Sequence, residues 1–242
     1  TVVAFGYAFE QWGMGAFPWV VCIIMLGIWL ASLFVQQTNG LSKKEADARP
    51  ATRFLSYLKQ RPVWVFYVVV MLMQVSHGPY YTFLSVYLEA LGYSRQLVGW
   101  LWSIGVLAEI LLFILMPTLL LRFGLRHVLL VSLALAALRW IALGFGADSV
   151  LLLLLIQCLH AATVGSFHVA SMQFVQQTFP RRRQGQGQAL YVSLSGFGAA
   201  LGALYAGYMW DDAGAALTFL VAALVALFAF VLLLTGLKDT QE

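Results

Sequence analysis

The stretch LLLLLIQCLHAATVG, residues 151–165, decides the fold class of this 242-residue chain. It contains no Asp, Glu, Lys or Arg, and its polar and apolar side chains do not alternate. A strand of a membrane barrel would alternate over about 10 residues, whereas a helix that crosses the membrane needs about 20 apolar residues. The stretch therefore predicts a transmembrane helix, and its apolar run extends over residues 149–174.

Similar apolar runs lie on both sides of this segment. Each has about 18–26 residues and can cross a hydrocarbon layer ~30 Å thick as a helix. The chain is 62% hydrophobic and 10% charged, which excludes a soluble domain, a disordered tail and a disulfide-rich secreted module. We therefore predict an all-α membrane protein, a helical bundle, with further spans at residues 17–35, 63–88, 97–121, 128–145, 190–210 and 213–236.

The positive charges are distributed unevenly between the two sets of connections. Only Arg95 lies in one set, so the positive-inside rule makes the other set cytoplasmic, together with the carboxyl terminus. Because the net charge of +4 lies in these gaps and not on a basic face, it indicates topology and no nucleic-acid partner. The cytoplasmic set holds Lys43, Lys44, Arg49, Arg53, Lys59, Arg61, Arg122, Arg126, Arg181, Arg182, Arg183 and Lys238.

Three segments are expected along the chain. Residues 1–35 would hold the end of one helix, cut off upstream at residues 1–9, and one complete helix. Residues 36–62 form the one long polar connection and are expected to be a cytoplasmic linker with a short amphipathic helix around 53–60. Residues 63–242 would form a six-helix membrane unit. The chain is expected to be a fragment of a longer membrane protein.

Three ionisable residues fall at similar depth on successive predicted spans: Glu109, Arg139 and His160. Each lies about 17–18 Å from an end of its span at 1.5 Å per residue. Charges at this depth are costly, usually pair with one another and often mark a transport pathway. We expect Glu109 and Arg139 to neutralise each other beside a titratable His160. The alternative is a buried ion pair that only fixes helix packing.

Further candidate side chains lie in QVSHGPYY, residues 74–81, where Pro79 and Gly78 predict a helix kink. Gln74, His77 and Tyr80 could offer polar groups to a solute, although a plain proline kink with aromatic packing is the alternative. Trp102 could stack on an aromatic ring of the solute. His168 could take part or only pack, and no ligand spacing on its helix predicts a metal or another cofactor.

The small-residue helix over residues 193–207 is expected to serve helix packing, through its Gly198-xxx-Gly202 pattern.

LRFGLR, residues 121–126, resembles the second, degenerate copy of the major facilitator loop signature D-R-x-G-R-R. Leu121 replaces the acid, so the arginines and Gly124 carry the match. The segments QVSHGPYYTFLSVYLEALGYS, VGWLWSIGVLAEI, ALRW and LHAATVGSFHVASMQF, between residues 74 and 174, are similar to the phenylpropionate permease branch of the same superfamily.

This resemblance implies a transporter of twelve helices in two halves, in a bacterial inner membrane. The chain would supply the second half and the helix before it, with the missing N-terminal half as its partner. The resemblance also implies proton-coupled symport of a small organic solute, an aromatic acid, a nucleoside or a sugar.

The more distant lactose-type symporters place an acid, an arginine and a histidine on helices eight, nine and ten. Glu109, Arg139 and His160 match these three places. A glutamate follows the histidine by three residues in those symporters, and Thr163 stands there in this chain.

Two other functions remain open from the residues alone. A sensor or assembly subunit could keep the facilitator fold without transporting a solute. An intramembrane enzyme that uses His160 and His168 would also need a nucleophile or metal ligands at the same depth, and the sequence suggests no convincing set. We therefore expect no enzyme activity.

Overall fold

The computed structural model describes residues 17–34 and 54–237. The chain divides into two units, Thr1–Thr52 and Arg53–Glu242, which are described separately. In the first unit, helix α2 (Phe17–Leu33) exposes apolar side chains along its length, among them Trp19 and Ile23. The expected helix end at residues 1–9 and the linker up to residue 53 lie outside the described residues.

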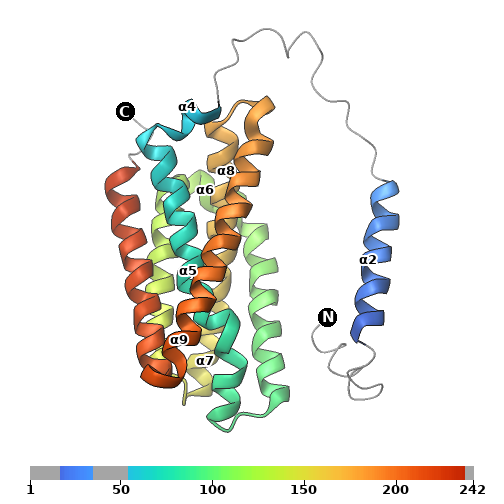
Figure 1. The fold of residues 1–242 in the computed structure, drawn as a ribbon, viewed down its shortest axis with the longest axis vertical. Helices are drawn as coiled ribbons and strands as arrows, with labels where there is room; N and C mark the ends of the chain where they lie inside the picture. The colour runs from blue at the N-terminus through green and yellow to red at the C-terminus, as the bar shows by residue number, and fades with distance from the viewer. Residues whose placement is uncertain (1–16, 35–53, 238–242) are drawn as a thin grey trace. The chain divides into compact units, whose positions relative to one another are not determined.

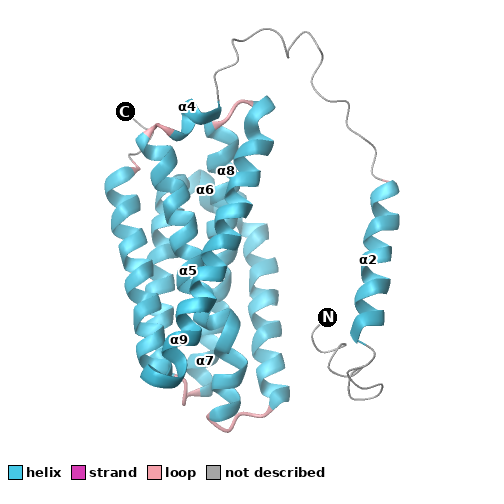
Figure 2. Cartoon of the chain, viewed as in Figure 1, coloured by secondary structure: helices cyan, strands magenta, loops and turns pink. Residues whose placement is uncertain are grey.

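The second unit is a bundle of long helices, drawn in Figures 1 and 2. All regular structure within the described ranges is helical, so the predicted all-α class is confirmed. Four helical stretches are long and apolar enough to cross a membrane. They are built from α5 (Arg61–Ala90), α6 (Arg95–Gly146), α7 (Val150–His160) continued by the π-helix η2 (Ala161–Gly165) and α8 (Ser166–Thr178), and α9 (Arg181–Gly236).

Two of these stretches contain a sharp break at a glycine. Gly124 in α6 has φ 75° and ψ 161°, and Gly214 in α9 has φ 79° and ψ 170°. Side-chain-bearing residues rarely adopt such positive φ angles, so glycine suits both turns. Gly124 lies in the gap between two predicted apolar runs, whereas Gly214 is the second residue of the predicted run over residues 213–236. Residues 97–121 and 128–145 thus form two rods of α6, and residues 190–210 and 213–236 form two rods of α9.

Short helix α4 (Phe54–Leu58) occupies part of the segment expected to form an amphipathic helix. Its Phe54 ring stacks on Phe179 with ring centroids 5.2 Å apart, and Tyr57 lies against the same ring at 5.5 Å. These aromatic contacts attach α4 to the segment that joins α8 and α9.

Glycines bring α5 and α9 into close contact. A Cβ atom on Gly202 would lie 2.6 Å from the carbonyl oxygen of Val75, and one on Gly198 would lie 2.4 Å from that of Met71. Only glycine allows this approach of two helix backbones. The helix continues through Pro79, whose missing N–H frees the Val75 carbonyl that faces Gly202. The pattern Gly198-xxx-Gly202 therefore serves helix packing, as expected.

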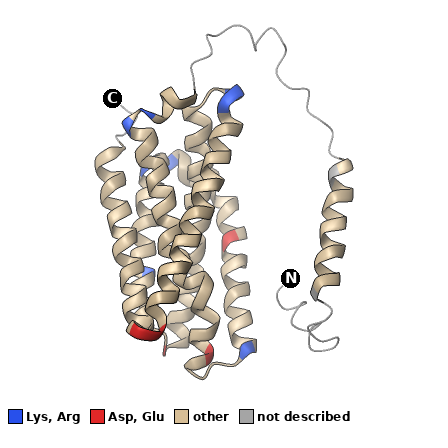
Figure 3. Ribbon diagram, viewed as in Figure 1, with Lys and Arg blue, Asp and Glu red and all other residues tan. Residues whose placement is uncertain are grey.

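Charged side chains gather at the two ends of the bundle, with basic residues dominating one end and acidic residues the other (Figure 3). At the basic end, Arg126 donates to the carbonyl oxygen of Leu234 at 3.0 Å, near the carboxyl end of α9. At the opposite end, Arg95 and Glu89 form an ion pair of 3.1 Å. The middle of the bundle is apolar apart from a small group of polar side chains.

Candidate functional site

Arg139 is the most buried charge of the described bundle, with no exposed surface. It lies on the second rod of α6 and points to the helix formed by α7 and η2. Its Nε donates to the carbonyl oxygen of Ile156 at 3.0 Å, and its two terminal nitrogens contact Thr163 Oγ1 at 2.9 Å and His160 Nδ1 at 3.0 Å. The whole guanidinium is thus held by uncharged partners.

Two aromatic rings also hold the guanidinium. Its Cζ atom lies 4.3 Å from the centroid of Tyr80 and 4.6 Å from that of Trp140. The Tyr80 hydroxyl donates to Gln157 Oε1 at 2.7 Å, and its ring packs against Trp102 at 4.9 Å. Cation–π contacts of a desolvated guanidinium contribute about 2 kcal/mol each. The rings thus offset part of the desolvation of the charge.

We refer to Arg139 with Tyr80, Trp140, His160 and Thr163 as the arginine cage. Arginine nitrogens only donate hydrogen bonds, so Nδ1 of His160 accepts and its proton lies on Nε2. The histidine is therefore a neutral acceptor in this structure.

The π-helix lies at the cage. Residues Ala161–Gly165 follow directly after His160, the last residue of α7, and include Thr163. A π-turn inside an α-helix is rare and often occurs at a functional site. The Thr163 hydroxyl donates to the carbonyl oxygen of His160 at 3.1 Å while it accepts from Arg139. Both hydrogen-bonding roles of this hydroxyl are thereby used inside the cage.

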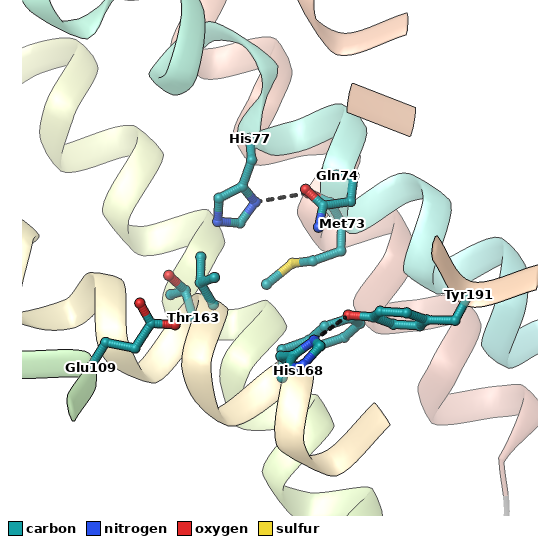
Figure 4. A pocket seen from close by; sticks show the side chains of 9 residues that line it. Met73, Gln74, His77, Glu109, Thr163, His168 and Tyr191 are labelled. Carbon is teal, nitrogen blue, oxygen red and sulfur yellow. Dashed lines mark hydrogen bonds between the residues drawn. The ribbon is translucent and has the colours of Figure 1, made fainter. Parts of the chain in front are cut away.

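A cavity of about 250 Å³ lies next to the cage, and Thr163 borders both. Figure 4 shows its labelled side chains: Glu109 and Thr163 on one side, His168 and Tyr191 on another, and Gln74, His77 and Met73 on a third. Its walls come from α5, the first rod of α6, the π-helix, α8 and α9. The lining residues are Met73, Gln74, His77, Glu109, Thr163, Val164, Phe167, His168 and Tyr191.

Glu109 lies at this cavity and not in the arginine cage. Its carboxylate forms no hydrogen bond or ion pair with any residue in the described ranges. Its side chain lies against Gly165, where an added Cβ would meet Glu109 Cγ at 3.0 Å. The expected ion pair of Glu109 with Arg139 is therefore wrong for this structure. Similar depth did not bring the two side chains together, because Arg139 points into the cage.

The other predicted residues divide between the cage and the cavity. Tyr80 belongs to the cage and its hydroxyl is bonded to Gln157, while the Trp102 indole donates to Ser85 Oγ at 3.1 Å. Gln74 and His77 line the cavity. His168 also lines it, and its Nδ1 lies 3.0 Å from the Tyr191 hydroxyl.

Sequence reasoning missed several residues of the site. Gln157 precedes His160 by three residues and Thr163 follows it by three, so helical spacing places all three near one face. Trp140 follows Arg139 directly, and adjacent residues on a helix do not normally face each other, so the residue order carried no signal for their cation–π contact. Tyr191 carried no comparable signal, because it lies beyond the arginine run at the start of α9.

His160 and His168 have separate partners, Arg139 and Tyr191. Among the described residues, no group of three or more His, Cys, Asp or Glu is placed to hold a metal ion.

Comparison with known proteins supports the resemblance found in the sequence. Residues 1–221 match the MFS_1 like family. The chain belongs to this family. It is 32% identical over 228 residues to the "Probable 3-phenylpropionic acid transporter" of Escherichia coli (strain K12), which covers 89% of this chain and 58% of the relative. The predicted similarity to the phenylpropionate permease branch is thus confirmed.

A second curated relative and a solved structure also match. The "Uncharacterized transporter YwbF" of Bacillus subtilis (strain 168) is 24% identical over 214 residues, 88% of this chain and 53% of the relative. The crystal structure of nucleoside transporter NupG superposes with a TM-score of 0.66 at 18% identity, over 81% of this chain and 55% of that one. The chain spans little more than half the length of these relatives. It is an integral membrane protein with a transporter fold.

Proposed function

We propose that this chain forms the carboxyl-terminal half of a secondary active transporter that moves a small organic solute together with protons by alternating access. The solute classes considered are an aromatic acid, a nucleoside and a sugar. The missing N-terminal half would close the other side of the binding site. The basic end of the bundle would face the cytoplasm, with the carboxyl terminus, in a bacterial inner membrane.

The observation that carries this proposal is the unpaired carboxylate of Glu109 at a cavity in the middle of the bundle. A carboxylate at membrane depth is costly unless it lines a pathway or exchanges its charge. Binding a proton removes that charge. Glu109 is therefore the proton carrier in this proposal, since the Thr163 position offers no carboxylate and the imidazole of His160 is engaged by Arg139.

The arginine cage would act as the rigid wall of the site. Arg139 does not line the cavity, and its three nitrogens have partners. It thus holds α6 against the α7–η2 helix, and a direct contact with solute would require the cage to open.

In this proposal, solute binding and proton binding are coupled through the protonation state of Glu109. Ionised Glu109 would favour a conformation in which the carboxylate contacts water or solute, and protonated Glu109 would favour one in which it is enclosed. Solute bound at the cavity then favours one protonation state, so that the two fluxes are linked.

The test is transport in vesicles that contain the complete transporter, with 3-phenylpropionate and uridine as probes. Glu109→Gln is expected to abolish accumulation driven by a pH gradient and to retain solute counterflow, because exchange of solute needs no net proton movement. Glu89→Gln is the matched control, since Glu89 is exposed and pairs with Arg95 at the end of the bundle. Accumulation by Glu109→Gln at the wild-type level would contradict the proposal.

A further inference from the structure

His77 lines the cavity and has one buried ring nitrogen without a hydrogen-bond partner in the described residues. Its Nδ1 lies 2.8 Å from the carbonyl oxygen of Met73, and a carbonyl only accepts, so Nδ1 carries the proton. Nε2 therefore holds a lone pair, and it has no partner within the described ranges. Figure 4 shows Nδ1 turned to Met73 and the other ring nitrogen on the side away from it. The side chain is 2% exposed, and because Nδ1 donates to Met73, Nε2 can only accept a hydrogen bond.

The surroundings of His77 keep the imidazole uncharged. Its ring packs edge-on against Trp140 with centroids 4.7 Å apart, and the Arg139 Cζ atom lies 4.6 Å from the centroid of the same indole. A second positive charge so close to a buried cation is unfavourable. A buried acceptor left without a donor is also unfavourable, which points to a group that binds there.

Glu109 is the acidic residue of the cavity lining, and Gln74, His168 and Tyr191 add groups that can both donate and accept hydrogen bonds. Glu109 brings an unpaired carboxylate, and no Lys or Arg is among the lining residues. The Thr163 hydroxyl is used inside the cage. A solute carboxylate in this cavity would face ionised Glu109 without a compensating positive charge, and like charges in a medium of low dielectric constant repel strongly.

From these observations we propose that His77 Nε2 and the Glu109 carboxylate form an acceptor pair that recognises hydroxyl or N–H groups of an uncharged solute. The inference rests on the proposed transport function and narrows its solute to hydroxylated, uncharged molecules of the sugar or nucleoside type. An aromatic acid is disfavoured in this cavity while Glu109 is ionised, although a relative is named for one. His77 is a specificity residue, because it selects the chemical group of the solute and does not bind the transported proton.

The first experiment measures binding to the purified complete transporter by ligand-induced thermal stabilisation, which rises with ligand concentration relative to the dissociation constant. The probes form two matched pairs: uridine with uridine 5′-monophosphate, and 3-phenylpropan-1-ol with 3-phenylpropionate. We expect at least one hydroxylated probe to bind about tenfold or more tightly than its anionic counterpart. Equal or tighter binding of the anionic probes would overturn the inference, as would a lack of binding by both hydroxylated probes.

The second experiment tests His77 itself. His77→Asn keeps an amide N–H near the Nδ1 position, able to donate to Met73, and places no acceptor at the Nε2 position. Affinity for the hydroxylated probe is expected to fall about five- to tenfold while thermal stability without probe stays near wild type. His127→Asn is the control, since His127 is exposed and is not among the residues that line the cavity. Unchanged affinity in His77→Asn would contradict the role of Nε2.

The two proposals can fail separately. Vesicles that exchange 3-phenylpropionate faster than the hydroxylated probes would support transport and refute the uncharged solute. Purified protein that binds uridine through His77, in vesicles that exchange no probe, would support the acceptor pair and refute transport.

Discussion

Arg139 donates a hydrogen bond to Nδ1 of His160 over 3.0 Å, between two helices in the middle of the bundle. The contact fixes the imidazole as a neutral acceptor, because a guanidinium has no lone pair to offer. The positive charge is thus stabilised by neutral acceptors and by the rings of Tyr80 and Trp140. Glu109 does not serve as its counter-ion, as the proposed role of Glu109 in proton exchange requires.

Replacement of His160 should reveal the acceptor at Nδ1. His160→Asn keeps an oxygen near the position of Nδ1 and should retain most of the stability. His160→Ala leaves an arginine N–H buried without a partner, so we expect a loss of about 1–3 kcal/mol in the free energy of unfolding. The stabilities of both variants are compared by thermal melting in detergent. Equal melting temperatures for the two variants would contradict the hydrogen bond.

The contact of α5 with α9 makes Gly202 sensitive to a single methyl group. Gly202→Ala would place Cβ 2.6 Å from the Val75 carbonyl oxygen, and forcing the helices apart should cost about 1–3 kcal/mol. Gly207→Ala on the same helix is the control, because nothing lies within 4 Å of its Cβ position. It should be neutral or slightly stabilising, since alanine favours helix. A melting temperature of Gly202→Ala at or above that of Gly207→Ala would show that the close contact is absent.

The orientation proposed from the positive charges can be measured by cysteine labelling in intact cells. With Cys22 and Cys158 replaced by serine, Asp148→Cys should react with a membrane-impermeant maleimide added outside. Arg181→Cys should react only after the cells are opened, because it lies at the basic end of the bundle. Both positions are exposed at helix ends. The reverse labelling pattern would invert the topology.

The sequence predicted the helices well because each apolar run had to span a membrane. Runs over residues 97–121 and 128–145 were separated correctly at the loop that contains Gly124, where the positive φ marks a turn. The depth of Arg139 and His160 was also predicted well enough that their side chains meet. The depth of a residue in the membrane follows directly from its position along the helix, at a rise of 1.5 Å per residue.

The direction in which each side chain points was harder to predict. Rotation about the helix axis places Arg139 in the aromatic cage and Glu109 at the cavity, although both lie at mid-span. The π-turn at Ala161–Gly165 alters that rotation next to Thr163, and nothing in the residue pattern signalled it. The tautomer of His77 depended on the Met73 carbonyl, which is a backbone group and has no signature in the sequence.

If Glu109 exchanges a proton during transport as proposed, it must not be held in an ion pair with Arg139. A double-mutant cycle of Glu109→Gln and Arg139→Gln tests this most directly, with the free energy of unfolding of the complete transporter measured for each variant. We predict that the two effects add to within about 0.5 kcal/mol, as they do for residues without a shared interaction. A coupling of about 1.5 kcal/mol or more, or recovery of folding in Arg139→Gln when Glu109→Gln is added, would demonstrate an ion pair and contradict the account.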